Sequence, residues 1–437
     1  MDNNLKNKIL KRNVITGVIG MGYVGLPLAM AAVKRGLKVV GFDIDNEKIK
    51  FLNDGINYIK HLDKKDFKEF CESEKFQASS DFSKLKDVDV IVICVPTPLT
   101  KNKDPELKYI ISTTETIAKI LRKRQLIILE STTYPGTTDE LMKNMLEKTG
   151  FKEGKDFYLA FSPEREDPGR KDYTTTTTPK VVGGVSKTSG ELATLFYSLF
   201  IDKVVPVKNA RTAEATKLTE NIFRAVNIAL VNELKIIYDR MGIDIWDVLD
   251  AASTKPFGFM RFNPGPGWGG HCIPLDPFYL TWKAKEYGLN SNFIEHAGEI
   301  NRKMPEYVIE KLNLGLNYKK RCVKDSKILL IGVAYKKDID DPRESPAFEI
   351  IELLLNLGAK VSYYDPYILE LPKMREWPKL PKLKSVQITS KKIANYDAVI
   401  IVTNHQNVDY DLIQKNANLI IDTRGVYKIS HKNVLKA

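Results

Sequence analysis

The residues best able to do covalent chemistry lie in one rigid stretch late in the chain. Residues 262–277, FNPGPGWGGHCIPLDP, hold four prolines and four glycines and contain a single cysteine, Cys272. A free cysteine is usually a small buried apolar residue. A cysteine in so constrained a loop, with Asp276 four residues further on, is better suited to act as a nucleophile. His271 is adjacent, but neighbouring side chains usually diverge, so we predict Cys272 as the nucleophile of a covalent step.

Two polar residues, Lys217 and Asn221, precede this loop and stand four positions apart. They fall in a predicted long helix over 210–240, so they share one face of it. A lysine on a largely apolar face is costly unless it is paired or takes part in chemistry. We predict a functional role for Lys217, with a structural ion pair as the alternative.

A glycine-rich turn near the N-terminus has the pattern GxGxxG, at Gly20, Gly22 and Gly25. It follows a predicted strand over 14–19, opens a predicted helix and precedes Asp43 at the next strand end. In this setting the glycines permit a tight turn, close approach of a pyrophosphate and close helix packing. Asp43 would accept hydrogen bonds from a ribose diol and repel a 2′-phosphate, which favours NAD over NADP. The alternative is a turn whose glycines serve packing alone.

More cofactor contacts are predicted at neighbouring strand ends, because ligands of open parallel sheets bind beyond the carboxyl ends of the strands. The segment after strand 88–95 and the run 130–133, ESTT, meet this condition, and a hydroxyl of the run could face the nicotinamide or a catalytic water. A simple turn is the alternative for either segment. Lys48 could brace the adenosine side, with a solvated helix lysine as the alternative. The predicted contacts beyond the glycines and Asp43 are Tyr23, Val24, Lys48, Pro96, Thr97 and Thr132.

A second candidate ligand site follows a predicted strand over 327–331. Residues 332–345, GVAYKKDIDDPRES, place two lysines and an arginine at the strand end, with Ser345 available as a helix cap. We predict a phosphate-bearing ligand there, and a solvated charged loop is the alternative.

Strands alternating with helices must position all these residues, and the pattern occurs twice. The predicted strands are 14–19, 37–42, 88–95 and 126–129 in the first half and 327–331, 360–364 and 398–402 in the second. We therefore predict an α/β fold with two Rossmann-like doubly wound parallel-sheet domains joined by a long central helix. The predicted divisions are 1–208, 209–310 and 311–437.

Composition and charge narrow the class of protein. The chain has 437 residues, of which 43% are hydrophobic and 28% charged, which excludes disordered, collagenous and coiled-coil proteins. Its net charge of +12 is not accompanied by an aromatic-rich basic module, so we expect no nucleic-acid partner. Anionic small substrates would suit the charge.

Four cysteines form no CxxC pair, which indicates a reduced, intracellular protein. Residues 13–33 are uncharged and follow basic residues, but they contain four glycines and a proline, which is turn chemistry rather than that of a membrane span or signal. We expect a cytoplasmic protein with no membrane partner and no metal site.

Along nearly its whole length the sequence resembles the UDP-glucose/GDP-mannose dehydrogenase family of nucleotide-sugar 6-dehydrogenases. The motifs that carry the resemblance, in the family's order, are VIGMGYVGLPLA, VPTP, EST, SPE, KLTEN, GPGWGGHC with Asp276, and GVAYKKDIDDPRES. The resemblance implies an NAD-binding domain over 1–208, a central dimerisation domain with the catalytic loop over 209–310, and a UDP-binding domain over 311–437. It also implies a UDP-sugar substrate and a homodimer or higher homo-oligomer.

The activity implied by the resemblance is a four-electron oxidation of a sugar C6 alcohol to a carboxylate with two NAD+. Cys272 captures the intermediate aldehyde as a thiohemiacetal, which is oxidised to a thioester that water hydrolyses. Lys217 stabilises oxyanion character and Asn221 helps to hold the same oxygen. The remaining implied catalytic residues, which assist water activation or proton transfer, are Asp276, Glu164 and Thr132.

The resemblance also implies contacts with the nucleotides. Arg261 reaches across the dimer to the substrate, Lys336 contacts UDP, and Arg343 lies near the cofactor phosphates. The predicted substrate-binding residues are Glu164, Lys217, Asn221, Arg261, Gly269 and Lys336.

The run 163–169, PEREDPG, and the His271 before the cysteine resemble the branch that acts on UDP-N-acetylhexosamines more than the UDP-glucose branch. We predict UDP-N-acetylglucosamine as substrate, with UDP-N-acetylmannosamine and then UDP-glucose as alternatives. Two other classes compete. A two-electron NAD-dependent hydroxyacid dehydrogenase needs neither Cys272 nor a second nucleotide domain, and a non-catalytic nucleotide sensor has no need for the polar set around Cys272.

Overall fold

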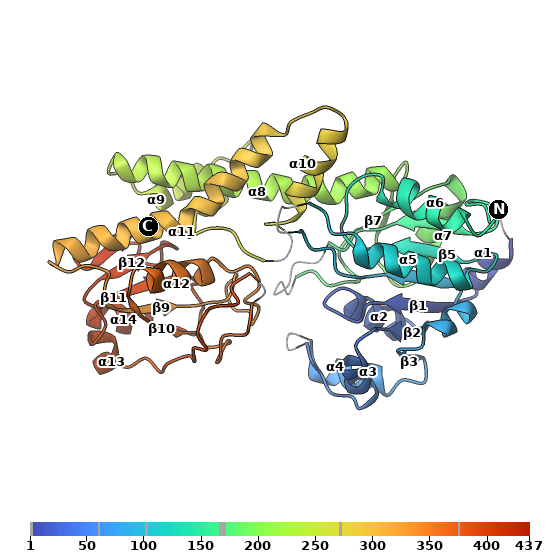
Figure 1. Ribbon diagram of the computed structural model, residues 1–437, viewed down its shortest axis with the longest axis horizontal. Helices are drawn as coiled ribbons and strands as arrows, with labels where there is room; N and C mark the ends of the chain where they lie inside the picture. The colour runs from blue at the N-terminus through green and yellow to red at the C-terminus, as the bar shows by residue number, and fades with distance from the viewer. Residues whose placement is uncertain (1–2, 60–61, 101–103, 166–171, 271–272, 375) are drawn as a thin grey trace. The chain divides into compact units, whose positions relative to one another are not determined.

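The computed structural model describes residues 3–59, 62–100, 104–165, 172–270, 273–374 and 376–437 (Figure 1). They fall into two compact units. The first unit consists of Met1–Glu220 with Phe278–Leu289, and the second of Asn221–Pro277 with Asn290–Ala437. Each unit contains one β-sheet. The three-part division predicted from the sequence, at 208 and 310, stays a prediction.

The sheet of the first unit has eight strands in the order β3-β2-β1-β4-β5-β6-β7-β8. Its first six strands have the Rossmann order, and neighbouring strands are parallel except β6 and β7. The strands are β1 (Ile15–Ile19), β2 (Lys38–Phe42), β3 (Phe76–Ser79), β4 (Val90–Ile93), β5 (Leu126–Leu129), β6 (Tyr158–Phe161), β7 (Lys180–Gly184) and β8 (Val204–Pro206).

Helices cover both faces of this sheet, because successive strand residues alternate between two apolar clusters. Val90 and Val92 pack in one cluster, whereas Ile91 and Ile93 pack in the other, and all four are fully buried. The helical segments are α1 (Asn3–Leu10), α2 (Gly25–Lys34), α3 (Asn46–Asn53), α4 (Lys64–Cys71), η1 (Phe82–Asp87), α5 (Lys108–Ile120), η2 (Thr137–Met142), α6 (Lys143–Glu147) and α7 (Lys187–Tyr197).

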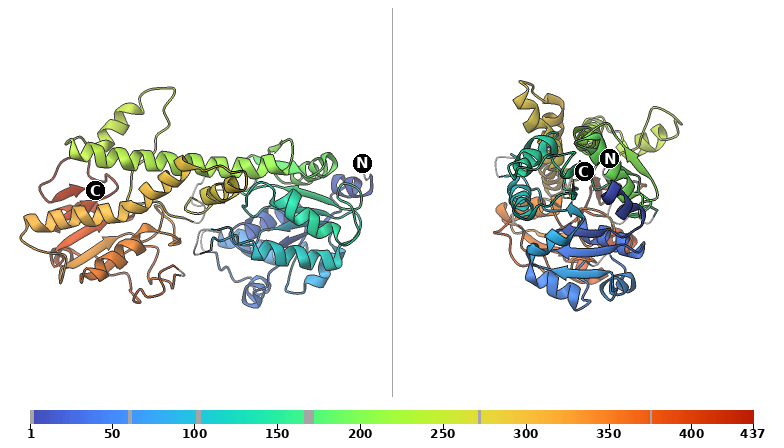
Figure 2. Two further views of the ribbon diagram at one scale, coloured as in Figure 1. Left: turned by 45° about the horizontal axis from the view of Figure 1, so that its top comes forward. Right: turned by 90° about the vertical axis from the view of Figure 1, so that its right-hand side faces the viewer.

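The predicted long helix is present as α8 (Ala210–Arg240), a continuous helix of 31 residues (Figure 2). Residues up to Glu220 belong to the first unit and the remainder to the second. The helix α10 (Asp276–Glu286) likewise begins in the second unit and continues in the first. The predicted site residues Lys217 and Asn221 of α8 therefore belong to different units. Among the described residues, no helix is both long and apolar enough to cross a membrane.

The second unit contains a five-stranded parallel sheet in the order β10-β9-β11-β12-β13. Its strands are β9 (Lys327–Ile331), β10 (Lys360–Tyr364), β11 (Ala398–Ile401), β12 (Ile420–Asp422) and β13 (Val434–Lys436). Its remaining helices are α9 (Ile245–Ala252), α11 (Asn292–Tyr318), α12 (Pro346–Asn356), α13 (Ser390–Ala394) and α14 (Tyr410–Asn416). The predicted fold class, two doubly wound sheets and a long helix, is confirmed.

Candidate active site

The glycine turn between β1 and α2 leaves space on one side. Gly20 has a φ of 94°, and a Cβ there would overlap the Cys94 carbonyl oxygen. A Cβ on Gly25 would overlap the Gly20 carbonyl oxygen, so its absence lets α2 begin close to β1. A Cβ on Gly22, in contrast, would meet no atom within 4 Å. The turn therefore fits a bound pyrophosphate, with Gly22 at the point of close backbone approach.

Asp43 follows β2 and is buried beside this turn. Its Oδ2 accepts a hydrogen bond from the Met21 N–H at 2.9 Å and lies 3.3 Å from the Lys48 Nζ. Its Oδ1 accepts the Asp45 N–H at 3.0 Å. The carboxylate thus holds the glycine turn in place as well as standing at the predicted ribose position. Lys48 braces that carboxylate directly.

Among the three hydroxyls after β5, one differs in its bonding. Ser131 donates to the Val95 carbonyl oxygen at 2.8 Å, and the hydroxyls of Thr133 and Thr137 lie 2.6 Å apart. Thr132 is half-buried, and its hydroxyl makes no hydrogen bond within the described residues. This is the bonding expected of a hydroxyl that serves a ligand or a water.

The predicted contacts Pro96 and Thr97 follow β4 at the same edge of the sheet as the glycine turn. Pro96 is exposed and Thr97 is buried. The Thr97 carbonyl oxygen accepts a 2.5 Å hydrogen bond from the Tyr279 hydroxyl, which ties this segment to α10. Tyr23, within the glycine turn, is 45% exposed, whereas Val24 is partly buried.

A buried cluster of Glu130, Lys180 and Tyr197 at the end of β5 was not predicted from the sequence. Glu130 is paired with Lys180 at 3.0 Å and accepts the Tyr197 hydroxyl. Burial raises the pKa of Glu130, although Lys180 and Tyr197 oppose the shift. Lys180 reaches this edge because β7 runs antiparallel to β6, so the first residue of β7 lies beyond the end of β6. Strand direction is a tertiary property that the local sequence does not signal.

Lys217 and Glu164, both predicted site residues, are in contact. The Lys217 side chain is buried, and its Nζ donates to the Glu164 carbonyl oxygen at 2.5 Å. Arg165 fastens the same segment, because it pairs with Glu220 of α8 at 2.5 Å and donates to the Pro179 carbonyl oxygen at 2.6 Å. The lysine on α8 therefore faces the SPE motif within the first unit.

Asn221 and Asp276, also predicted site residues, form a second pair, within the second unit. The Asn221 Nδ2 donates to the Asp276 Oδ2 at 2.5 Å, and both side chains are buried. The bond ties α8 to the first residue of α10 and thereby to the end of the Gly/Pro loop. Cys272 and His271 lie outside the described residues.

The Gly/Pro loop packs against the charged segment after β9. A Cβ on Gly269 would lie 2.8 Å from the Tyr335 Cβ and 2.9 Å from the Glu344 carbonyl oxygen. The Gly270 N–H donates to the Arg343 carbonyl oxygen at 3.2 Å. Glycine is therefore required where the loop that carries Cys272 meets segment 335–344, and the two predicted site segments are adjacent.

Three predicted basic contacts also lie in the second unit. Lys336 is partly buried in the segment after β9. Arg343 pairs with Asp341 at 2.6 Å. Arg261 pairs with Asp250 and donates to Asn263 at 2.9 Å.

Arg424, after β12, is a candidate that the sequence analysis missed. Its Nε donates to the Val402 carbonyl oxygen at 2.7 Å, and its guanidinium packs where a Cβ on Gly265 would lie. Burial lowers its pKa to about 10, so it stays charged at neutral pH. No carboxylate pairs with this guanidinium within the described residues. A partly buried cation of this kind, at the carboxyl edge of a parallel sheet, suits a phosphate or a sugar hydroxyl.

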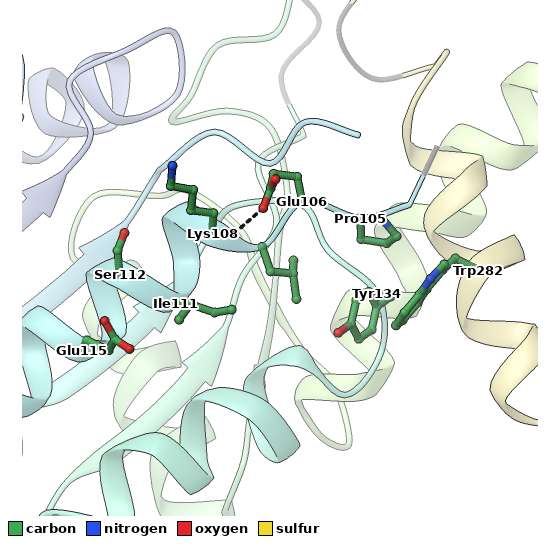
Figure 3. A pocket seen from close by; sticks show the side chains of 9 residues that line it. Pro105, Glu106, Lys108, Ile111, Ser112, Glu115, Tyr134 and Trp282 are labelled. Carbon is green, nitrogen blue, oxygen red and sulfur yellow. Dashed lines mark hydrogen bonds between the residues drawn. The ribbon is translucent and has the colours of Figure 1, made fainter. Parts of the chain in front are cut away.

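A hollow of about 620 Å³ lies elsewhere in the first unit, beside the N-terminal end of α5. Figure 3 shows Tyr134 and Trp282 next to one another at one end of it, with ring centroids 4.9 Å apart. Its other lining residues are Pro105, Glu106, Leu107, Lys108, Ile111, Ser112 and Glu115. None of the predicted site residues lines this hollow.

A glycine turn for a dinucleotide, a basic segment for a second phosphate-bearing ligand and a polar set on α8 define a class of NAD-dependent dehydrogenases with two nucleotide-binding domains. Comparison with known families supports this assignment. Residues 14–201 match the NAD binding domain of the UDP-glucose/GDP-mannose dehydrogenase family, 211–303 its central domain and 329–429 its UDP binding domain. The chain belongs to this family.

Similar proteins align over nearly the whole chain. A UDP-N-acetyl-D-mannosamine dehydrogenase of Pyrococcus horikoshii is 36% identical over 94% of this chain and 95% of its own length. A solved structure of the UDP-D-ManNAc dehydrogenase from that organism matches with a TM-score of 0.87, covering 97% and 98% of the two chains at 34% identity. A UDP-N-acetyl-D-glucosamine 6-dehydrogenase of Pseudomonas aeruginosa is 35% identical, covering 90% of this chain and 91% of its own.

The chain is therefore an NAD-dependent nucleotide-sugar 6-dehydrogenase. The predicted NAD cofactor and UDP-binding domain are confirmed at the level of the domains. The hydroxyacid dehydrogenase and the non-catalytic sensor are set aside, because neither class accounts for three family domains in this order.

Proposed function

We propose that the chain oxidises the C6 hydroxyl of a UDP-N-acetylhexosamine to a carboxylate, with UDP-N-acetylglucosamine as the leading substrate. The proposal rests on the packing of Gly269 and Gly270 onto segment 335–344, which brings the loop of Cys272 next to the basic segment expected to hold UDP. The relatives named above act on UDP-N-acetylated sugars, which supports the acetamido class.

When bound, NAD+ accepts the two electrons of each oxidation step, and the glycine turn with Asp43, Lys48 and Thr132 would hold it. Side chains of the protein supply the nucleophile and the positive charge. Cys272 adds to the aldehyde to form a thiohemiacetal, and the later thioester is hydrolysed by water. Lys217 supplies positive charge where an oxyanion develops on C6.

The proton transfers are assigned to two carboxylates. Asp276 is held by Asn221, and an ionised carboxylate can accept a proton from water. Lys217 binds the backbone carbonyl oxygen of Glu164. The Glu164 carboxylate and the lysine are therefore assigned to the same part of the substrate. Arg261 and Arg424 are proposed substrate contacts.

The choice of sugar is tested with a panel of UDP-N-acetylglucosamine, UDP-N-acetylmannosamine, UDP-N-acetylgalactosamine and UDP-glucose, following NADH and the uronic acid. A pocket that pairs both polar atoms of an acetamido group strongly rejects a sugar without that group. We expect two NADH per acid and the highest kcat/KM with an N-acetylated sugar. UDP-N-acetylmannosamine is the competing substrate, because a relative of that specificity matches equally well. Efficient turnover of UDP-glucose alone would exclude the acetamido class.

The covalent route is tested at Cys272. Cys272→Ala should stop acid formation while UDP and NAD+ still bind, because the aldehyde can no longer be held as a thioester precursor. Cys322→Ala is the matched control, since Cys322 is an exposed cysteine in the same unit. Acid formation by the Cys272→Ala protein near the parental rate would contradict the mechanism.

A homodimer is proposed on the exposed face of α8. Phe223, Leu230 and Ile237 are seven residues apart in sequence and 47%, 49% and 46% exposed, so they form one apolar stripe. A stripe of this spacing suits packing against a helix of a second copy. Leu230→Glu should convert the dimer to a monomer in light scattering, whereas Leu314→Glu, at a 40% exposed leucine of α11, should not. A cytoplasmic location also stays a prediction.

A further inference from the structure

The basic segment after β9 is fixed at its start by the loop that follows β11. Gly332 has a φ of 79°, and a Cβ there would overlap the Thr403 carbonyl oxygen. The Thr403 hydroxyl donates to the Ala334 carbonyl oxygen at 2.5 Å. The segment therefore leaves the sheet at a place where two loops are bonded to each other.

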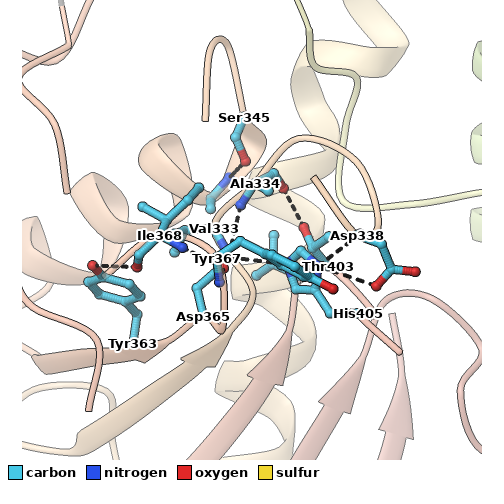
Figure 4. Close-up of polar contacts among 12 residues, drawn as sticks. Val333, Ala334, Asp338, Ser345, Tyr363, Asp365, Tyr367, Ile368, Thr403 and His405 are labelled. Carbon is cyan, nitrogen blue, oxygen red and sulfur yellow. Dashed lines mark hydrogen bonds and ion pairs between the residues drawn. The ribbon is translucent and has the colours of Figure 1, made fainter. Parts of the chain in front are cut away.

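A second connection lies four residues after Ala334 and joins Asp338 to His405, which is fully buried. The Asp338 N–H donates to the His405 Nδ1 at 2.9 Å, and the Asp338 Oδ1 accepts the Gln406 N–H at 2.7 Å. Asp338 has a φ of 60°, a left-handed backbone conformation that needs such support in a residue other than glycine. Figure 4 shows these contacts together with Tyr367, whose ring centroid lies 5.0 Å from that of His405.

The bonds of His405 determine its tautomer. A backbone N–H can only donate, so Nδ1 must be the unprotonated acceptor. The proton is then on Nε2, which donates to the Asp365 Oδ2 at 3.1 Å. His405 is thus a neutral imidazole that connects Asp365 on one side with Asp338 on the other.

Asp365 anchors this arrangement to the sheet. It is fully buried after β10, and its Oδ2 also accepts the Val333 and Ala334 N–H groups at 2.7 and 3.2 Å. Its Oδ1 accepts the Tyr367 and Ile368 N–H groups at 2.8 and 3.0 Å. With five donors, the carboxylate tolerates the loss of one far better than the partly buried N–H of Asp338 tolerates the loss of its acceptor.

We infer that His405 is a positioning residue for the uridine nucleotide. His405 holds Asp338, and the bonds of Ala334 to Thr403 and Asp365 hold the other end of the short stretch that carries Lys336. Both ends of that stretch are therefore fixed. The inference rests on the proposed placement of UDP at Lys336. Because His405 itself contacts Asp338 and Asp365, it acts through the loop and not through the substrate.

Two substitutions separate the two bonds of the imidazole. Asn places its Oδ1 near the position of Nδ1, and Gln places its side-chain amide near the position of Nε2. His405→Asn should keep an acceptor for the Asp338 N–H, and His405→Gln should keep a donor to Asp365 but leave that N–H unpaired. We expect His405→Gln to weaken UDP binding about tenfold and His405→Asn by less than about threefold, by calorimetry on the whole protein. Hydrogen exchange at the Asp338 amide should speed up in the Gln variant alone, and NAD+ binding should change in neither.

A merely structural histidine would give a different pattern, with UDP affinity following the loss of Tm in both variants. Equal losses of UDP affinity, no loss, or a greater loss in the Asn variant would overturn the inference. The control is His431→Gln, at a partly buried histidine of the same unit that is hydrogen-bonded to Gln414.

Two further variants keep the test decisive. Should the His405 variants not fold, Asp338→Gly suits the positive φ, keeps the backbone N–H that binds His405 and removes only the side-chain bond to Gln406. UDP affinity should then fall by less than about threefold with the fold intact, and a loss of about tenfold or more would assign the positioning to the Gln406 bond and overturn the inference. Lys336→Ala tests the placement of UDP independently. Unchanged UDP affinity in Lys336→Ala together with the expected split at His405 would disprove that placement and leave the positioning role standing.

Discussion

In both sheets the first strand ends at a glycine of positive φ, and the second strand ends at a buried aspartate that accepts backbone N–H groups from the turn. Gly20 and Asp43 form this arrangement in the first sheet, and Gly332 and Asp365 form it in the second. In the first sheet α2 begins almost at once, whereas in the second a long basic segment precedes α12. The partner of the aspartate differs as well, since Lys48 approaches Asp43 and His405 approaches Asp365.

This difference separates the scaffold from the ligand site. The glycine and the aspartate maintain the turn in both sheets, so both belong to the scaffold, and Asp43 is in addition predicted to bind the ribose. A short turn exposes helix N–H groups to a pyrophosphate. A long basic segment offers side-chain cations, but it needs the bonds of Asp365 and His405 to keep one conformation.

The largest effect is expected at the two turn glycines. Gly20→Ala and Gly332→Ala should each lower the free energy of unfolding by about 3 kcal/mol or more, because the new methyl group meets a backbone carbonyl at a positive φ. Thermal and denaturant unfolding measure this. Gly22→Ala is the control, since its Cβ has open space, and it should lose NAD+ affinity with little change in stability. A stable Gly20→Ala protein would contradict the shared role of the two glycines.

The two aspartates should differ when each is changed to asparagine. Asp365→Asn should destabilise the protein by about 2–3 kcal/mol, because an amide cannot accept all five N–H groups that the carboxylate accepts. Asp43→Asn should cost less stability, since fewer donors surround Asp43, and should instead narrow the preference for NAD+ over NADP+. The ratio of kcat/KM for the two cofactors measures that change. Comparable use of both cofactors by the parent protein would refute the ribose assignment of Asp43.

The two lysines should separate the two nucleotides. Lys336→Ala should weaken UDP binding about tenfold and leave NAD+ binding unchanged, while Lys48→Ala should weaken NAD+ binding by a smaller factor, because a half-exposed lysine is partly screened by solvent. Calorimetry with each ligand separately measures both. Equal losses for the two ligands in either variant would argue against separate nucleotide sites.

The smallest expected effect is the pH dependence of stability, which has opposite signs for Glu214 in the first unit and Asp365 in the second. Burial raises the pKa of Glu214 on α8 to about 7, so the stability linked to this group is present below pH 4.5 and is lost as pH rises through about 7. Burial opposes ionisation of Asp365 too, but bonds from His405 and backbone N–H groups lower its pKa, so its contribution is lost only under acid conditions, below its ordinary pKa. The parent Tm should therefore rise between pH 7.5 and 5.5. Glu214→Gln should flatten this rise, and an unchanged slope would contradict the assignment.

Much of the fold was predictable because short apolar runs are punctuated by glycine. The predicted strands Leu126–Leu129, Lys327–Ile331 and Lys360–Tyr364 have the observed bounds, and α8 spans the predicted residues. The antiparallel direction of β7 was not predicted, and Lys180 was therefore missed as the partner of Glu130. A lone lysine before an apolar run carries no sign of a buried carboxylate fifty residues earlier.

Arg424 and His405 were not predicted as site residues, for a related reason. Each has a role only because a loop far away in sequence supplies its partner, which is Val402 with Gly265 for Arg424 and Asp338 with Asp365 for His405. Spacing rules describe neighbours on one helix or one turn, and these contacts join loops that are far apart in the sequence. A polar residue shortly after the predicted strand 398–402 is the signal that could have drawn attention to His405, whereas no strand was predicted before Arg424.

The sequence by itself determined the class of fold, the two turns and the residue types that could do chemistry, because local backbone geometry and side-chain polarity depend on nearby residues. The tertiary structure alone decided which of those residues meet. Lys217 lies against the Glu164 carbonyl, Asn221 holds Asp276, and Gly269 lies against segment 335–344, only because distant elements pack together. Burial removes a polar group from water, so the group must form a hydrogen bond with whichever residue the packing places beside it. A buried polar group left unpaired costs more free energy than a single hydrogen bond contributes to stability.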